Sequence, residues 1–234
     1  MSFIESIFLG IIQGITEFFP ISSSGHLLIG MNLFKIDEFN LLIEIALHIG
    51  TLIAILIYWR NDYLYEFSQL KGGDKTTFAN IVIATIPAGF SGLFLKEHIE
   101  KIFYNSNVLS NLIIAYLIMS GLLFISKFYH NNKIKSITLI NAFLIGAAQA
   151  LAIIPGISRS GFTIVVALLL GIKFNKALKF SFMLAIPILL FAGADSLFNN
   201  IDLLFSNRNF LIILFIGMLS SAVSGYYILA ILEK

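Results

Sequence analysis

The chain has 234 residues, of which 58% are hydrophobic and 12% charged, and its mean hydropathy is +0.93. This composition excludes an ordinary soluble domain, in which about a quarter of the residues are charged, and indicates an integral membrane protein. The formal net charge is only +2 and the basic residues form no run, so we expect no nucleic acid as a partner. The sequence has no cysteine, which excludes disulfides and thiolate metal sites.

Apolar segments of about 20 residues predict five helices that cross the membrane. They are 40–58, 77–95, 108–127, 177–197 and 210–232. Two further apolar stretches, 2–34 and 138–172, are each interrupted by a polar break with a proline. The helices predicted after these breaks, 27–34 and 162–172, are too short at 1.5 Å per residue to cross a hydrocarbon core of about 30 Å. Each stretch therefore predicts a re-entrant hairpin, which enters and leaves the membrane on one face.

The two hairpins are copies of each other, because six positions of the first recur in the second at an offset of 136 residues. They are Gly10, Gln13, Ile21, Ser22, Ser24 and Gly25, which match Gly146, Gln149, Ile157, Ser158, Ser160 and Gly161. Three full spans separate the hairpins, so the second enters from the opposite face. The sequence therefore predicts one all-α membrane domain, 1–234, with two inverted-topology repeats at about 1–130 and 136–234.

The basic residues predict how the chain is oriented in the membrane. On this topology the face that carries the N-terminus has four of them, and the opposite face has ten. The four are Lys35, Lys96, Lys101 and Arg208. By the positive-inside rule the N-terminus lies outside and the C-terminus in the cytoplasm. No cleavable signal is expected, because no basic residue precedes Lys35.

Glu17 is an acid inside an apolar stretch of the first hairpin. Burying such a charge costs about 2.5–3.5 kcal/mol on insertion scales, so it requires a partner, a wet cavity or a function. Gln13 lies four residues earlier and therefore on the same helix face. Oxygen ligands on one face suit a divalent cation such as Mg²⁺ or Ca²⁺, which would bridge phosphate oxygens. The alternative for Gln13 is a hydrogen bond to a neighbouring helix.

Arg159 lies in the polar break of the second hairpin, directly before a predicted short helix. Its guanidinium offers a planar fork of donors, and Ser158, Ser160 and the free N–H groups of the helix start add neutral donors. These groups predict a phosphate-binding site. In the alternative, Arg159 only pairs with Glu17 and ties the hairpins together. Thr163 either donates to the phosphate or bonds back to a carbonyl of its own helix.

The serines of the first hairpin, Ser22, Ser23 and Ser24, are either helix caps or reactive groups, and capping is favoured for any single one. A nucleophilic serine needs a base within reach. His26 is the only histidine of the hairpins and follows Ser23 by one helical turn, so the two form a candidate nucleophile and base. His26 could instead be a polar residue satisfied by a neighbouring helix.

Glu44 and His48 form a second pair, at positions i and i+4 of the span 40–58. The two side chains either support the site or satisfy each other within the bundle, and we favour the second role. Gln149 is the repeat of Gln13 in the second hairpin, and we count it among the supporting residues for that reason.

These motifs together resemble a known family. The stretches QGITE at 13–17, PISSSGH at 20–26, EIALHIGTL at 44–52 and PGISRSG at 155–161 look like the signatures of bacterial undecaprenyl-diphosphate phosphatases, also called bacitracin resistance proteins. The resemblance runs from the N-terminus to about the last span. It implies a plasma-membrane hydrolase that removes one phosphate from undecaprenyl diphosphate and so regenerates the lipid carrier of peptidoglycan and other envelope polymers.

The resemblance also implies roles for individual residues. The catalytic groups would be Glu17, Ser23, His26 and Arg159, and a divalent cation would be needed. Supporting or phosphate-binding groups would be Gln13, Ser22, Ser24, Ser158, Ser160 and Thr163. The chain departs from the family pattern in two ways, since many members carry a second Glu at the position of Gln13 and a further helix after 210–232. Without that helix the two repeats are unequal.

From these features we expect the hairpin tips to meet at a polar cavity that opens outward. The diphosphate would lie between the N-termini of the two short helices, where Arg159 and a cation on Glu17 offset its charge. Either Ser23 attacks the terminal phosphorus with His26 as base, or a water held by His26 or Glu17 attacks directly. The expected partners are the prenyl diphosphate, membrane lipid and, in a homodimer, a second copy.

A different class of function is compatible with the same pattern. Inverted repeats with broken helices are also the architecture of secondary transporters, in which half-helix N-termini face an anionic substrate. A carrier for a phosphate-bearing lipid or a small anion would use Arg159 but would not require Ser23, His26 and Glu17 as a reactive set.

Overall fold

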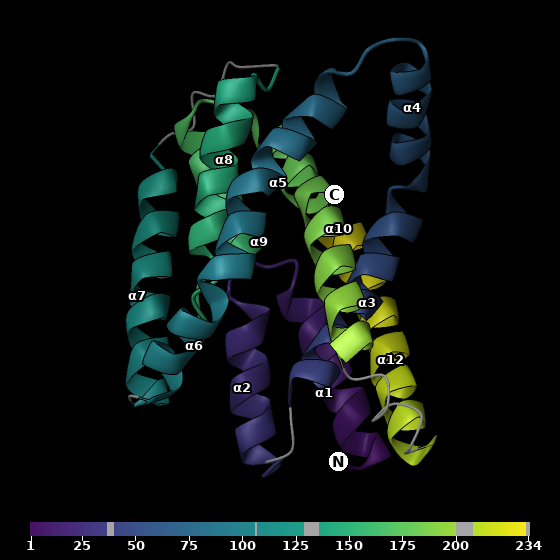
Figure 1. The fold of residues 1–234 in the computed structure, drawn as a ribbon, viewed down its shortest axis with the longest axis vertical. Helices are drawn as coiled ribbons and strands as arrows, with labels where there is room; N and C mark the ends of the chain where they lie inside the picture. Colours follow the sequence, from purple (N-terminus) through teal and green to yellow (C-terminus); the bar gives the residue numbers. More distant parts are fainter. Residues whose placement is uncertain (37–39, 106, 129–135, 200–207, 233–234) are drawn as a thin grey trace. The chain divides into compact units, whose positions relative to one another are not determined.

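The structure is a computed structural model that describes the chain except residues 37–39, 106, 129–135, 200–207 and 233–234 (Figure 1). Its helices are α1 (Phe3–Thr16), α2 (Ser23–Leu33), α3 (Asn40–Tyr58), α4 (Arg60–Lys71), α5 (Thr76–Phe94), α6 (Lys96–Asn105), α7 (Val108–Ser126), α8 (Leu139–Leu151), α9 (Arg159–Leu169), α10 (Phe174–Asn199) and α12 (Arg208–Leu232). The described regular structure is thus helical, as the sequence predicts.

The five predicted spans correspond to α3, α5, α7, α10 and α12, with ends that differ by three residues at most. Four of them, α5, α7, α10 and α12, are long and apolar enough to cross a membrane. The described part of α3, Leu42–Tyr58, meets the same criterion together with α4, and the two helices are bent by 72°. The chain is therefore a multi-pass helical membrane protein.

Two short helices lie where the sequence predicts only connections. α4 and α6 follow α3 and α5 directly and are rich in charged residues, which is why a search for apolar runs misses them. In α6, Phe103 is buried while His98 is exposed as predicted; the other loop histidine, His130, lies outside the described residues. In α4, Asp62 forms an ion pair with Lys179 of α10. α6 is amphipathic, and such helices are typical of the membrane–water interface.

The helices after the two polar breaks begin earlier than predicted. α2 starts at Ser23 and α9 at Arg159, so the serines of each break belong to the helix start, and both helices have 11 residues. Their bounds, Ser23–Leu33 and Arg159–Leu169, match exactly at the offset of 136 residues. Figure 1 shows α1 beside α2 and α8 beside α9, as two hairpins require. This correspondence supports the predicted repeat.

The described residues form two compact units. The first comprises 1–18, 23–61 and 186–234, and the second comprises 19–22 and 62–185, so that the boundary falls inside α10. In the first unit α12 packs against both α1 and α3. In the second unit α8 packs against α5 and α9.

Glycines at equivalent positions of the two repeats allow close helix crossings in both units. A Cβ atom added to Gly10 of α1 would lie 2.5 Å from the carbonyl oxygen of Gly217 in α12. A Cβ atom added to Gly146 of α8 would lie 2.6 Å from the Cα atom of Ala84 in α5. Gly10 and Gly146 are repeat partners, and α12 and α5 are each the second long helix after a hairpin. Each hairpin therefore packs in the same way against a helix of the other repeat.

Hydroxyl groups reinforce the crossing of α1 and α12. Ser6 donates to the carbonyl of Ile213 at 2.6 Å, and Ser220 donates to the carbonyl of Ile7 at 2.9 Å. Helices in lipid associate through such close packing and interhelical hydrogen bonds, because burial of apolar surface gives little drive between helices there.

Replacing Gly146 by alanine should lower the melting temperature of the purified protein by several degrees, because the new methyl group meets the α5 backbone. Gly121→Ala in α7 is the matched control, since its Cβ meets nothing within 4 Å and alanine favours a helix. Thermal unfolding in detergent measures both. Equal melting temperatures for the two variants would contradict the close crossing.

Candidate active site

Glu17 is the centre of a polar cluster in the first unit. It is the C-cap of α1 and only 6% exposed. Its Oε2 atom accepts hydrogen bonds from Ser23 Oγ at 2.6 Å and from Gln13 Nε2 at 3.0 Å, and lies 3.4 Å from His48 Nε2. Side chains from α1, α2 and α3 thus converge on one carboxylate oxygen. These donors offset the cost of burying the acid.

The local backbone explains how Ser23 reaches Glu17 from the next helix. Gln13 and Glu17 are one helical turn apart and share a face. Residues 17–21 form a turn, and Ser22, which is buried, has a φ of +63° in the left-handed region. This conformation destabilises a non-glycine residue by about 1–2 kcal/mol. That conformation reverses the chain so that α2 starts with its first hydroxyl against the carboxylate.

His48 contacts the cluster from α3, which the sequence reasoning did not favour. Its Nδ1 atom lies 2.8 Å from the backbone carbonyl of Glu44, so this nitrogen donates its hydrogen there. Its Nε2 atom faces Glu17. The favoured interpretation, in which Glu44 and His48 satisfy each other, is thus incomplete: the backbone of Glu44 orients the ring, and the ring meets Glu17. The i, i+4 spacing of Glu44 and His48 indicated only that the two side chains share a face of one helix. It did not indicate a contact with Glu17 of another helix.

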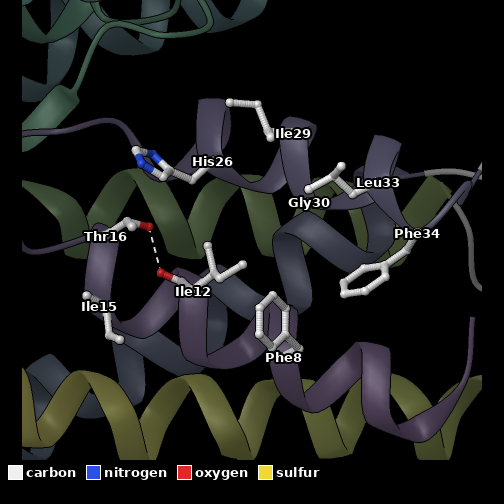
Figure 2. A pocket seen from close by; sticks show the side chains of 9 residues that line it. All are labelled: Phe8, Ile12, Ile15, Thr16, His26, Ile29, Gly30, Leu33 and Phe34. Atoms are coloured by element: carbon white, nitrogen blue, oxygen red, sulfur yellow. Dashed lines mark hydrogen bonds between the residues drawn. The ribbon is translucent and has the colours of Figure 1, made fainter.

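His26 is the base that the sequence predicts for Ser23, and it lies three residues after Ser23 on the same helix. It is half-buried on α2 and lines an apolar groove together with Thr16, as Figure 2 shows. The hydroxyl of Ser23 donates to Glu17. The structure therefore brings Ser23 together with the carboxylate, which makes Glu17 a candidate base beside His26.

In the second unit, Ser158 and Ser160 lie at the start of α9. Ser158 is the N-cap, and its Oγ atom accepts from the N–H of Gly161 at 3.1 Å. The Oγ atoms of Ser158 and Ser160 are 3.3 Å apart, and both residues are buried. Arg159 is half-buried, and its Nη1 atom donates to the carbonyl of Ser181 in α10 at 3.5 Å. Two hydroxyls, a guanidinium and a helix N-terminus therefore gather within three successive residues.

Thr163 takes the second of its two predicted roles. Its hydroxyl donates to helix carbonyls, lying 2.9 Å from that of Arg159 and 3.0 Å from that of Ser160. It also lies 2.7 Å from the hydroxyl of Ser181, so it joins α9 to α10. Ser181 was not anticipated, because a lone serine in an apolar span carries no motif.

The repeated glutamines retain unused hydrogen-bonding capacity. Gln13 is fully buried, and its Oε1 atom has no hydrogen-bond partner among the described residues. Gln149 is 4% exposed, and within the same described part of the chain both of its amide atoms lack a partner. Its i+4 neighbour is Ile153, where the first repeat has Glu17. A buried amide atom without a partner costs about 1–3 kcal/mol, so such atoms are suited to a ligand.

The side-chain oxygen atoms of Gln13 and Glu17 are suited to a divalent cation that takes its other ligands from the substrate and from water. The described residues hold no group of three or more His, Cys, Asp or Glu side chains that could bind a metal alone. The unpartnered Oε1 atom of Gln13 and the carboxylate of Glu17 provide two oxygen donors. Mg²⁺ commonly binds through one or two such groups while phosphate and water supply the rest.

The fold and these two sets of residues define an α-helical integral membrane protein with a buried serine–carboxylate pair and an arginine at a helix start. The family model of bacitracin resistance protein BacA matches residues 6–234. The chain therefore belongs to the bacitracin resistance protein family.

Curated relatives agree with this assignment. An undecaprenyl-diphosphatase of Caldicellulosiruptor bescii is 39% identical over 100% of this chain and 90% of its own length. One of Saccharophagus degradans is 38% identical over 100% of this chain and 91% of its own length. One of Bacteroides thetaiotaomicron is 41% identical over 80% of this chain and 72% of its own length. These relatives are named as hydrolases, which supports the enzyme over the transporter alternative.

Proposed function

We propose that this protein hydrolyses undecaprenyl diphosphate to undecaprenyl phosphate and inorganic phosphate, and so recycles the lipid carrier of cell-envelope polymers. Membership of the family and the names of the relatives support this function. The observation that carries it is the buried hydrogen bond of 2.6 Å from Ser23 to Glu17. It pairs a nucleophile with an acceptor for its proton, which is the arrangement that nucleophilic catalysis requires.

In the proposed reaction Ser23 Oγ attacks the terminal phosphorus while Glu17 accepts the hydroxyl proton. The bond between that phosphorus and the bridging oxygen breaks, and undecaprenyl phosphate leaves with the proton that Glu17 had accepted, so Glu17 is again a carboxylate. Water then attacks the phosphoserine with Glu17 as base, the bond from phosphorus to Ser23 Oγ breaks, Oγ takes up the proton and inorganic phosphate is released. In the competing mechanism, Glu17 activates a water that attacks the phosphorus directly. Because the hydrogen bond already joins Ser23 to Glu17, we favour the first mechanism.

Arg159, Ser158 and Ser160 bind the phosphates in this proposal, with Ser22 and Ser24 as further donors. A guanidinium fork and a helix N-terminus are both suited to phosphate oxygens. Gln13 Oε1 and Glu17 would hold the divalent cation, Mg²⁺ or Ca²⁺. The cation would offset negative charge on the phosphate oxygens.

His48 and Gln13 are positioning residues for Glu17. Each contacts Oε2, and the ring of His48 is fixed by its second nitrogen on the Glu44 carbonyl. Together they hold the carboxylate in the rotamer that faces Ser23. Precise placement of a catalytic group depends on such supporting contacts.

The proposal predicts that Ser23→Ala and Glu17→Gln each lower kcat about a hundredfold or more, because each removes a reacting group. Ser68→Ala, on the exposed side of α4, is the control and should stay within a few-fold of the unmodified protein. Release of inorganic phosphate from a prenyl diphosphate in detergent measures all three. Rapid quenching of the unmodified enzyme should trap a phosphoserine at residue 23.

The result for Ser23→Ala separates the two mechanisms. Activity close to that of the unmodified protein, with no trapped phosphoserine, would overturn the nucleophilic role of Ser23. Direct attack by water on the phosphorus would then be the remaining mechanism.

His48→Ala should lower kcat about tenfold with little change in KM, because Glu17 loses a fixed contact and the substrate loses none. His48→Gln should recover most of the loss, since its amide can still donate to the carboxylate. His98→Gln, on the exposed side of α6, is the control. If His48→Gln were as impaired as His48→Ala, a positioning role through a hydrogen bond would be excluded.

We further propose that the protein lies in the bacterial plasma membrane with its N-terminus outside, its C-terminus in the cytoplasm and its site facing outward. The chain contains no cysteine, so the labelling of a single introduced cysteine reports the side of the membrane on which that residue lies. In intact cells a membrane-impermeant maleimide should label Lys101→Cys but not Lys71→Cys; both positions are exposed. The reverse pattern would overturn the orientation.

Light scattering in detergent tests for the proposed homodimer.

A further inference from the structure

An apolar groove of about 230 Å³ runs between α1 and α2 (Figure 2). Both helices belong to the first unit. Aliphatic and phenylalanine side chains line the groove, and its two polar side chains, Thr16 and His26, lie at one end. Phe8 and Phe34 lie at the other end, with ring centroids 5.5 Å apart in an edge-to-face contact. The groove thus has one polar end and one aromatic end.

A glycine in α2 allows α1 and α2 to pack closely along the groove. Gly30 of α2 is buried, and a Cβ atom there would lie 2.9 Å from the side chain of Leu9. The rims are open, since Ile15 is 36%, Ile29 40% and Leu33 75% exposed. In a membrane protein such rims face lipid, so a hydrocarbon chain can enter from the side.

The two polar residues of the groove lie close along the chain to Ser23 and Glu17. Ser23 is the first residue of α2 and His26 follows three residues later, a rise of about 4.5 Å along the helix. Ser23 bonds to Glu17, and Thr16 is the residue before Glu17 on the chain. The polar end of the groove is therefore the end that is nearer to Ser23 and Glu17 along both helices.

We propose that this groove binds the first isoprene units of the prenyl tail, with the diphosphate at its polar end. The inference rests on the proposed function, because it takes the phosphorus to be at Ser23. A cavity of about 150 Å³ holds one benzene, which has six carbons, so the groove accommodates about nine to ten carbons, or two isoprene units. The rest of the tail then extends into the bilayer.

Kinetics with isopentenyl, geranyl and farnesyl diphosphates, which have one, two and three isoprene units, test the groove. For the unmodified protein KM should fall about tenfold or more from one unit to two and change little from two to three. Ile15→Trp fills the groove and should raise KM for geranyl and farnesyl diphosphates about tenfold, with a much smaller effect on isopentenyl diphosphate. Ile11→Trp is the matched control, one turn earlier on α1, 41% exposed and outside the groove.

The outcomes separate this inference from the proposed function. If the unmodified protein releases phosphate from all three substrates but Ile15→Trp and Ile11→Trp have the same KM values, the groove does not bind the tail and the function stands. If the protein releases no phosphate from any prenyl diphosphate, the proposed function fails first.

A binding measurement covers the case in which Ile15→Trp does not fold. A geranyl diphosphate analogue with a photoreactive tail should cross-link to residues 8–34, and excess farnesyl diphosphate should prevent the reaction. Ile29→Ala, which only removes contacts, should weaken the cross-link several-fold. Equal competition by phosphatidylglycerol vesicles would show that the groove is a general lipid site and overturn the inference.

Discussion

A carboxylate buried in an apolar protein must be satisfied within the protein, and this requirement at Glu17 organises the first hairpin. The oxygen Oε2 is in contact with α1, α2 and α3 through Gln13, Ser23 and His48. Ser22 adopts a left-handed backbone conformation, and this turn brings the hydroxyl of Ser23, the first residue of α2, to that oxygen. Strain of this kind persists only where surrounding contacts compensate for it, which is why it concentrates at functional sites.

The second constraint is that helices in lipid gain little from burying apolar side chains against each other. The structure meets it with glycine and serine at the crossings, where backbones approach closely and hydroxyls bond to carbonyls. Gly10 and Gly146 do this at equivalent positions of the two repeats. These equivalent contacts support the predicted repeat, and a helix of 11 residues follows each polar break.

Much of the fold could be predicted because membrane helices leave a strong signal. Continuous apolar runs located α3, α5, α7, α10 and α12, and the polar breaks located the hairpins. α4 and α6 were not predicted, because short helices rich in charged residues contain no continuous apolar run. The starts of α2 and α9 were placed too late, since the serines that cap or open a helix look like loop residues in a sequence.

The sequence by itself determined the membrane class, the positions of the spans, the two broken hairpins and the identity of the polar residues inside them. Those features depend on composition and on spacing along the chain. Only the tertiary structure decided which groups meet: Ser23 with Glu17, His48 with Glu17 from another helix, and Thr163 with Ser181. Such pairings depend on the turn at Ser22 and on how each helix is rotated against its neighbours, and a rotation of one residue position turns a side chain by about 100°.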